Sequence, residues 1–435
     1  MMAVAAVIFG GTLAGVVARQ LLRKGPPVWA IFVAGAFLTV ASGTLSVPAA
    51  SIAVAANLSI LVFLFSLFVF AAGLERAGAL DHVARWIVGR VRKPGDLSWM
   101  LFVAFGVLAA FVLNDALVLV GVPLLLTLAR RTRLPPEPLL LTLAFSVTVG
   151  SVLTPFGNPQ NLLVSLESGM RGPVATFLRY LLLPTALNLA VGGAYLRFRF
   201  GKALTPVAAP AESSPPTRLR LFPDRPLLPI LRSSPAVGLF PVTMVVMVTT
   251  DVAASVTRGP QVPLYAIALG GAVVTLLASP GRKALVERVD WSILLLFAAL
   301  FVVVAGAVAG GVVGAVESLL PISGPAEPIR GVASILLTSL GGAQLVSNVP
   351  WVGLQIPAMH GLGYGPGTPW AWVALAAGST LAGNVTLLGA ASNLIVVEEA
   401  ERAGIRIGLR TFVRYGLPLA GLTVAILFAC LAFGL

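Results

Sequence analysis

Apolar windows separated by short polar loops dominate the chain from one end to the other. A window of about 20 apolar residues is long enough to cross a hydrocarbon core of roughly 30 Å as a helix. We therefore predict about ten membrane crossings, near residues 3–22, 28–48, 51–74, 138–166, 174–196, 236–256, 261–279, 290–314, 369–397 and 412–433.

Two further apolar segments, residues 98–129 and 331–360, do not fit a plain crossing. The first is 32 residues long, whereas two full crossings need about 40 residues and a turn. A single crossing would export one of its flanking basic clusters, Arg90–Lys93 or Arg130–Arg133, although Lys and Arg favour the cytoplasmic side. A re-entrant hairpin that enters from the cytoplasm satisfies both limits. The same reasoning predicts that residues 331–360 form a hairpin that enters from outside.

This arrangement predicts two halves of opposite orientation, because each half holds an odd number of crossings. We predict an N-terminal repeat over 1–202 and an inverted C-terminal repeat over 236–435. The Pro-rich stretch 203–235 is expected to be a cytoplasmic linker. Residues 76–97 are expected to form an amphipathic interfacial helix. Of the 29 Lys and Arg residues, those left on the outer side are Arg171, Arg179, Arg258 and Arg330.

A polar, helix-breaking string interrupts the window 138–166, and a related string interrupts the window 369–397. The first reads TPFGNPQNL over Thr154–Leu162, and the second reads TLLGAASNL over Thr386–Leu394, 232 positions later. Backbone freed from helical pairing at membrane depth must line a cavity or be buried in protein. A matched pair of broken helices, one in each half, therefore indicates a transporter binding site.

The hairpins carry the same internal repeat. NDALVLVGVP, over Asn114–Pro123, aligns with NVPWVGLQIP, over Asn348–Pro357, at an offset of 234 positions. Gly73 and Gly306 match at an offset of 233 positions in two further apolar strings. These matches support the inverted repeat.

Composition excludes a soluble domain and several classes of function. Apolar residues make up 58% of the chain, charged residues make up 10%, and the mean hydropathy is +0.97. A net charge of +13 reflects basic loops without interleaved aromatic residues, so no nucleic acid partner is expected. Cys430, the single cysteine, permits no internal disulfide. We expect a multi-pass protein of the cell membrane, surrounded by the lipid bilayer.

Asp115 is the carboxylate of the first hairpin and is expected at its tip beside Asn114. A carboxylate at membrane depth marks an ion or proton pathway by default, and the alternative is that Asp115 caps the second hairpin arm. Unwound carbonyls near Gly157 and Asn158 suit a hard cation, although a proline kink held by amide contacts is the alternative. We predict cation coupling at Asp115, Gly157 and Asn158, with a sodium ion at Asn114, Gly157 and Asn158.

The substrate is expected to bind between the hairpin tips and the breaks. The hairpins and breaks contain no Lys or Arg, so an anion would be held by helix dipoles, amide and hydroxyl donors and a co-bound cation. A weakly charged or neutral oxyacid fits as well. The predicted substrate contacts are Asn114, Thr154, Asn161, Ser347, Asn348, Thr386, Ser392 and Asn393.

The strings NDALVL, GSVLTPFGNPQNLL, VDWSILLLFAALFVVVAG and GNVTLLGAASNLI resemble the ion transporter superfamily. This superfamily includes citrate and divalent-anion symporters, arsenite permeases and one type of sodium/proton antiporter. The resemblance implies an elevator-type carrier, often a homodimer, with sites at the hairpin tips and broken helices. Dicarboxylate symporters of this superfamily carry a Ser-Asn-Thr triplet at each tip, whereas this chain has Asn114-Asp115-Ala116 and Ser347-Asn348-Val349. A general anion or oxyanion permease therefore fits better than a dicarboxylate symporter.

The leading hypothesis is a secondary active transporter of a small anion or oxyanion, coupled to a sodium ion or a proton. Sodium/proton antiport through Asp115 and efflux of arsenite or antimonite are the alternatives. An intramembrane enzyme is disfavoured because the chain lacks HExxH and GxSxG motifs. No cofactor is expected beyond the coupling ion.

Overall fold

The computed structural model describes residues 2–22, 25–80, 82–83, 96–204, 234–312, 314, 318 and 320–434. Every regular element in these ranges is a helix, which confirms the predicted all-α fold. Eight of the described helices are long and apolar enough to cross a membrane by length and composition. Most of the predicted interfacial helix and of the predicted linker lies outside the described residues.

The first half contains α1 (Met2–Leu22), α2 (Val28–Ala41), α3 (Val47–Ala56), α4 (Leu58–Arg76), α6 (Leu97–Ala109), α7 (Asn114–Thr132), α8 (Pro136–Gly150), the 3₁₀ turn η2 (Ser151–Leu153), α9 (Pro159–Glu167) and α10 (Pro173–Phe200). The second half contains α12 (Pro235–Thr257), α13 (Leu264–Ala278), α14 (Arg282–Glu287), α15 (Trp291–Ala309), α17 (Pro328–Val346), α18 (Asn348–Gly361), α19 (Pro369–Ala382), the turn η3 (Leu387–Gly389), α20 (Ala391–Arg402) and α21 (Leu409–Phe433).

One predicted crossing, the window 51–74, is divided between two helices. Asn57 separates α3 from α4, and its side-chain Nδ2 donates to the carbonyl of Ala53 at 2.9 Å. An Asn side chain offers the backbone an alternative partner to the helical ladder, which favours an interruption at such a residue. The apolar residues on both sides conceal this break in the sequence.

The two halves share one packing pattern, which supports the repeat. The first hairpin arm α6 packs along α8, and its counterpart α17 packs along α19. The second segments of the broken helices cross over, because α9 contacts α18 of the other half and α20 contacts α7. Each break is thereby fixed against both hairpins.

Glycine permits the closest of these helix crossings. A Cβ added to Gly150 on α8 would lie 1.8 Å from the carbonyl oxygen of Gly106 on α6. Small residues allow helix backbones in a membrane protein to approach closely. The first hairpin arm is therefore seated directly against the helix that leads into the break.

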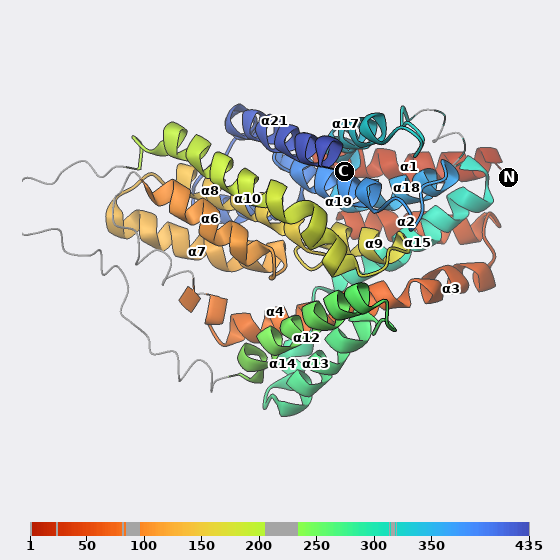
Figure 1. Ribbon diagram of the computed structural model, residues 1–435, viewed down its shortest axis with the longest axis horizontal. Helices are drawn as coiled ribbons and strands as arrows, with labels where there is room; N and C mark the ends of the chain where they lie inside the picture. The colour runs from red at the N-terminus through yellow and green to blue at the C-terminus, as the bar shows by residue number, and fades with distance from the viewer. Residues whose placement is uncertain are drawn as a thin grey trace, which may run out of the picture.

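The first hairpin lies at the opposite end of the molecule from α1, whereas the second hairpin, α17 and α18, lies near α1 and α15 (Figure 1). Helices α6, α7 and α8 lie at one end of the long axis, and α1, α2 and α3 lie at the other. Helices α12, α13 and α14 lie along one side with α4, and α13 packs against α4. Helices α9 and α19, which carry the breaks, lie near the centre.

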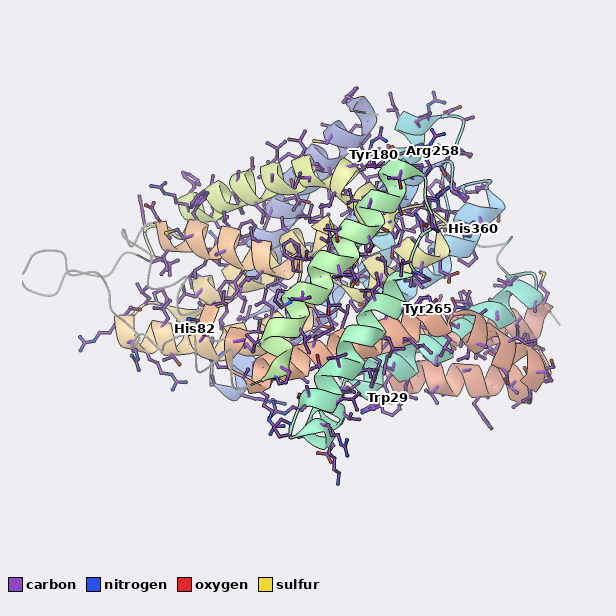
Figure 2. The ribbon with its side chains drawn as sticks, turned by 60° about the horizontal axis from the view of Figure 1, so that its bottom comes forward. Trp29, His82, Tyr180, Arg258, Tyr265 and His360 are labelled. Carbon is purple, nitrogen blue, oxygen red and sulfur yellow. The ribbon has the colours of Figure 1, made fainter. Side chains whose placement is uncertain are left out.

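Polar contacts join loops that are expected on the same side of the membrane. Arg171 donates to the carbonyl of Gly259 at 2.9 Å, and both are expected outside. Glu75 and Arg288 form an ion pair at 3.0 Å, and both are expected in the cytoplasm. Arg258 and His360 lie toward one end of the molecule and His82 toward the other (Figure 2). The predicted sidedness places the two members of each pair on the same side of the membrane.

Cysteine labelling tests this sidedness at the two ends of α13. In a Cys430→Ser background, Gln261→Cys is expected to react with an impermeant maleimide added outside intact cells. Lys283→Cys is expected to react only after the membrane is opened. Both positions are exposed, so labelling of Lys283→Cys in intact cells would contradict the predicted orientation.

Candidate functional site

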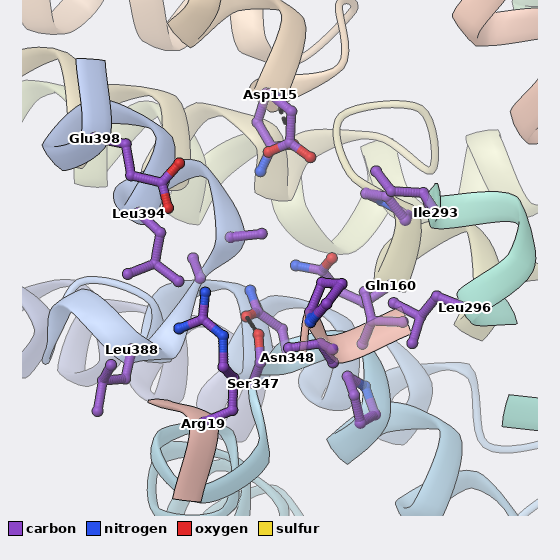
Figure 3. A pocket seen from close by; sticks show the side chains of 18 of the residues that line it. Arg19, Asp115, Gln160, Ile293, Leu296, Ser347, Asn348, Leu388, Leu394 and Glu398 are labelled. Carbon is purple, nitrogen blue, oxygen red and sulfur yellow. Dashed lines mark hydrogen bonds between the residues drawn. The ribbon is translucent and has the colours of Figure 1, made fainter. Parts of the chain in front are cut away.

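The two hairpin tips and the two helix breaks converge on one cavity of about 330 Å³. Asp115 lies on one side of this cavity, and the amides of Gln160 and Asn348 lie across from it (Figure 3). Helix α15 completes the wall with apolar side chains, which include Ile293 and Leu296. The site is thus a mostly apolar chamber with a few convergent polar groups, as is usual for sites that bind small molecules.

Four helices begin at this cavity. The first residues of α7, α9, α18 and α20 all contribute to its wall. The free N–H groups and the dipole at a helix N-terminus favour negative charge. These residues are Asn114, Pro159, Asn348 and Ala391.

The tip of the first hairpin is bonded directly to the first break. The backbone N–H of Asn114 donates to the carbonyl of Gly157 at 3.1 Å. The hydroxyl of Thr154 donates to the carbonyl of Ala110, at the end of the first arm. These contacts hold the tip against unwound backbone, so the break and the hairpin position one another.

The carboxylate of Asp115 is not used for capping in this structure. The backbone N–H of Asp115 donates to the side-chain Oδ1 of Asn114 at 2.9 Å, but no side-chain cap is formed at the start of α7. Asp115 Oδ1 is buried and has no hydrogen-bond partner. Since a buried carboxylate oxygen without a partner is costly, this group is available for a cation or a proton.

Two asparagines hold the first break in its unwound shape. Asn158 caps α9, because its Oδ1 accepts the N–H of Asn161 at 2.9 Å. The Nδ2 of Asn161 donates to the carbonyl of Ser151 at 2.9 Å. The hydroxyl of Thr380, from α19, lies within hydrogen-bond distance of Asn158 Nδ2, Gln160 Nε2 and Asn161 Oδ1. Thr380 therefore joins the first break to the second half of the chain.

The second break repeats two side-chain contacts of the first break at equivalent positions. The contact of Thr386 with Gln344 corresponds to that of Thr154 with Ala110, and the contact of Asn393 with Gly383 corresponds to that of Asn161 with Ser151. The hydroxyl of Thr386 donates to Gln344 Oε1 on the hairpin arm α17 at 2.7 Å. The Nδ2 of Asn393 donates to the carbonyl of Gly383 at 2.6 Å. The internal repeat thus holds for individual side-chain contacts and for helix packing.

The second break differs from the first in its unpartnered polar atoms. Ser392 Oγ, Asn393 Oδ1 and both side-chain polar atoms of Asn384 are buried without a hydrogen-bond partner. In the first break, Asn158 and Asn161 have partners for both ends of their amides. The two halves therefore share a backbone shape and differ in polar chemistry.

Ser347 sits in a strained conformation at the tip of the second hairpin. Its φ of 71° and ψ of 163° are rarely adopted by a residue other than glycine. This residue ends α17 and begins α18, so the strain reverses the chain and brings Asn348 to the cavity.

Charged side chains that the sequence analysis did not assign to the site also line the cavity. Arg19, in the last turn of α1, reaches the wall although the hairpins and breaks contain no basic residue. Glu398 and Glu401 of α20 line the same wall. In the sequence, Arg19 follows an apolar window and is typical of an anchor at the membrane surface. Its position at the substrate cavity depends on the tertiary packing of α1.

A second cavity, of about 250 Å³, continues along the same three helices. It is lined by Leu163 and Glu167 of α9, by Val304 of α15 and by Pro357 of α18, farther along each helix than the residues of the first cavity. Phe297 lines the central cavity and Leu300 lines the second one, and they are 0% and 2% exposed. These two side chains form an apolar layer along α15 where the two cavities approach each other.

The predicted site residues fall into two groups. The first group lines the cavity and consists of Asn114, Asp115, Ser347 and Asn348. The second group lies in or beside the breaks, behind the wall, and consists of Thr154, Gly157, Asn158, Asn161, Thr386, Ser392 and Asn393. Residues of the site that sequence reasoning did not select are Arg19, Gln344, Thr380, Glu398 and Glu401.

The repeated hairpins and broken helices around a central cavity define a multi-pass membrane transporter. The chain belongs to the citrate transporter family, whose sequence profile matches residues 16–378. The silicon efflux transporter LSI3 of Oryza sativa subsp. japonica is 28% identical over 412 residues, which is 83% of this chain and 84% of the relative.

Solved structures support the fold. The YdaH transporter of Alcanivorax borkumensis superposes with a TM-score of 0.56 and 16% identity, over 86% of this chain and 84% of that chain. MtrF of Neisseria gonorrhoeae, described within a class of antimetabolite efflux pumps, superposes with a TM-score of 0.53 and 15% identity, over 86% of this chain and 80% of that chain.

Proposed function

We propose that this protein is a secondary active transporter that moves a small oxyanion across the cell membrane with a coupled cation. One observation carries the proposal. An unpartnered carboxylate, Asp115, faces the amides of Gln160 and Asn348 in a cavity where four helices begin. Amide donors and helix N-termini suit the oxygens of an anion, and the carboxylate suits a sodium ion or a proton.

The balance of charge in the cavity favours coupling. Asp115 and Glu398 contribute two carboxylates, and Arg19 contributes one positive charge. An anion that enters this cavity is repelled unless a cation or protons accompany it, because like charges at close range in low dielectric are unfavourable. Simultaneous binding of the two ions is therefore the proposed basis of coupling.

The cavity surroundings also support alternating access of the elevator type. The residues that line it include Pro27, Val28 and Glu401, which adjoin loops expected in the cytoplasm. Along α15, the apolar side chain of Phe297 lines this cavity and that of Leu300 lines the second one. Movement of α9 and α18 along α15 would carry the site past this apolar layer. A homodimer, implied by the family resemblance, is part of the same proposal.

A weak oxyacid that is expelled from the cell is a second candidate substrate. The carboxylates of Asp115 and Glu398 disfavour an unaccompanied anion, and the aligned rice relative is a silicon efflux transporter. An uncharged oxyacid can use the same amide and hydroxyl groups as hydrogen-bond partners. Under this alternative, proton exchange at Asp115 would drive efflux.

A ligand screen followed by a transport assay tests the proposal. Purified protein is heated with citrate, succinate, sulfate, arsenite or silicic acid, each with and without sodium or lithium. A ligand that binds the folded state raises the melting temperature. At a concentration of 100 times its dissociation constant, it adds roughly 2.7 kcal/mol to the free energy of unfolding. We expect one oxyanion to raise the melting temperature more in the presence of sodium or at lower pH. The same oxyanion is expected to accumulate in proteoliposomes under a sodium or proton gradient. Sodium-dependent proton flux without any oxyanion would instead identify an antiporter, and the absence of all these responses would contradict the proposal.

A further inference from the structure

Arg19 is the one cationic side chain among the described residues that line the central cavity. It extends from the last turn of α1, which belongs to neither hairpin and packs against α2, α15 and the hairpin arm α17. Its guanidinium points into the cavity (Figure 3). The charge is therefore supplied by a helix that carries neither a hairpin tip nor a break.

No residue that the structure describes pairs with the guanidinium of Arg19. Arg19 Nε is buried and has no hydrogen-bond partner, and no ion pair or hydrogen bond joins Arg19 to any residue that the structure describes. Glu398 lies on the same wall and makes no ion pair with it. A buried donor on a charged group without a partner is costly, so this arrangement favours an anionic ligand.

The groups across the cavity complete a binding site for such a ligand. Gln160 and Asn348 present side-chain amides, and α9 and α18 present their N-termini. Arginine offers donors in a planar fork that matches two oxygens of one carboxylate, sulfate or phosphate group. An uncharged oxyacid gains less from this fork, because it lacks the Coulomb attraction between the guanidinium and a negatively charged ligand.

We infer that Arg19 binds the transported oxyanion directly and selects anions over uncharged oxyacids, an inference that rests on the proposed function. The ligand bridges α1 on one side and the amides of α9 and α18 on the other. Because α1 carries neither a hairpin tip nor a break, the contact exists in the conformation seen here and is lost when α9 and α18 move along α15. Arg19 therefore sets the affinity for the oxyanion on the side of the membrane to which this cavity opens.

Equilibrium binding and vesicle transport test the role of Arg19. The probes are radiolabelled sulfate and citrate, with silicic acid as the uncharged control. Arg19→Gln is expected to weaken anion binding at least tenfold and to leave silicic acid binding within twofold. Arg19→Lys, which keeps the charge without the fork, is expected to weaken anion binding about threefold. Arg179→Gln is the matched control, because Arg179 is exposed and lies over the ring of Tyr180.

The sidedness of the effect separates direct binding from a structural role. In inside-out and right-side-out vesicles, Arg19→Gln is expected to raise the KM for the anion from the cytoplasmic face and to leave the KM from the other face within twofold. Anion binding by Arg19→Gln within twofold of the wild type would overturn the inference, as would equal changes at both faces. If the wild type binds neither sulfate nor citrate but binds silicic acid, selection of anions by Arg19 is overturned while transport of an oxyacid stands. If the wild type binds none of the three, the proposed function itself fails.

Discussion

Replacing Asp115 with Asn is expected to remove the dependence of transport on the sodium and proton gradients. The amide has nearly the shape of the carboxylate, but it has no negative charge and does not take up a proton at neutral pH. Asp115 Oδ1 is buried without a partner in the cavity wall, so no hydrogen bond of the protein is lost. Cation binding typically improves the affinity of a coupled ligand about 5- to 150-fold, and this improvement should disappear.

The measurement compares substrate affinity and uptake with and without each gradient in proteoliposomes. Asp96→Asn is a matched control, because Asp96 lies just before the same hairpin, outside the cavity, and pairs with Arg197 at 2.8 Å. That pair is partly exposed and is worth roughly 1 kcal/mol or less, so Asp96→Asn should retain coupling. If Asp115→Asn responds to both gradients as the wild type does, Asp115 is not the coupling group.

The sequence predicts the helices and the breaks because both leave one-dimensional signals. Apolar windows of suitable length mark the crossings, and the string beginning at Thr154 marks a break that the structure places between α8 and α9. The second string marks the break between α19 and α20. The break at Asn57 was missed because it consists of one polar residue among apolar neighbours, a pattern common in uninterrupted membrane helices.

The site was predicted less completely, because its geometry depends on contacts between distant segments. Repetition in the sequence identified the polar residues of the breaks, but it does not show which of them face the cavity. Thr380 lies in an apolar helix and bonds to the first break across 219 to 222 positions of sequence. Arg19 has the position of a surface anchor, and the packing of α1 brings it to the cavity. Neither contact leaves a signal in local composition.

The repeat also explains why hairpins and breaks occur together in each half. An unwound segment leaves carbonyl and N–H groups that lipid does not satisfy. In the first half, the hairpin supplies the N–H of Asn114, which donates to Gly157 O, and the carbonyl of Ala110, which accepts from the hydroxyl of Thr154. In the second half, Gln344 of the hairpin arm bonds to both Thr386 and the carbonyl of Ala382. The hairpin is thus both a wall of the cavity and the structure that stabilises the break.

The asparagines at equivalent positions of the two breaks are expected to differ in their contribution to stability. Asn161→Ala removes a side chain whose Nδ2 donates to Ser151 O at 2.9 Å and to Thr154 O at 3.1 Å, and whose Oδ1 accepts from Thr380 at 3.1 Å. Because the carbonyls left behind are buried, we expect a loss of about 2 to 5 kcal/mol in the free energy of unfolding. Asn393→Ala removes one bond, to Gly383 O, and an Oδ1 that has no partner. We expect Asn393→Ala to lower the free energy of unfolding by about 1 to 2 kcal/mol.

Denaturant titration of the purified variants in detergent micelles measures both losses, and a double-mutant cycle identifies their source. Thr380→Val combined with Asn161→Ala should show a coupling energy of about 0.5 to 3 kcal/mol, because the two side chains share a hydrogen bond. The same Thr380→Val combined with Asn393→Ala should be additive to within about 0.5 kcal/mol, because no bond joins that pair. A larger loss for Asn393→Ala than for Asn161→Ala would mean that the unpartnered atoms of the second break are satisfied by water or a bound ion. In that case the second break, and not the first, would be the more rigid support of the cavity.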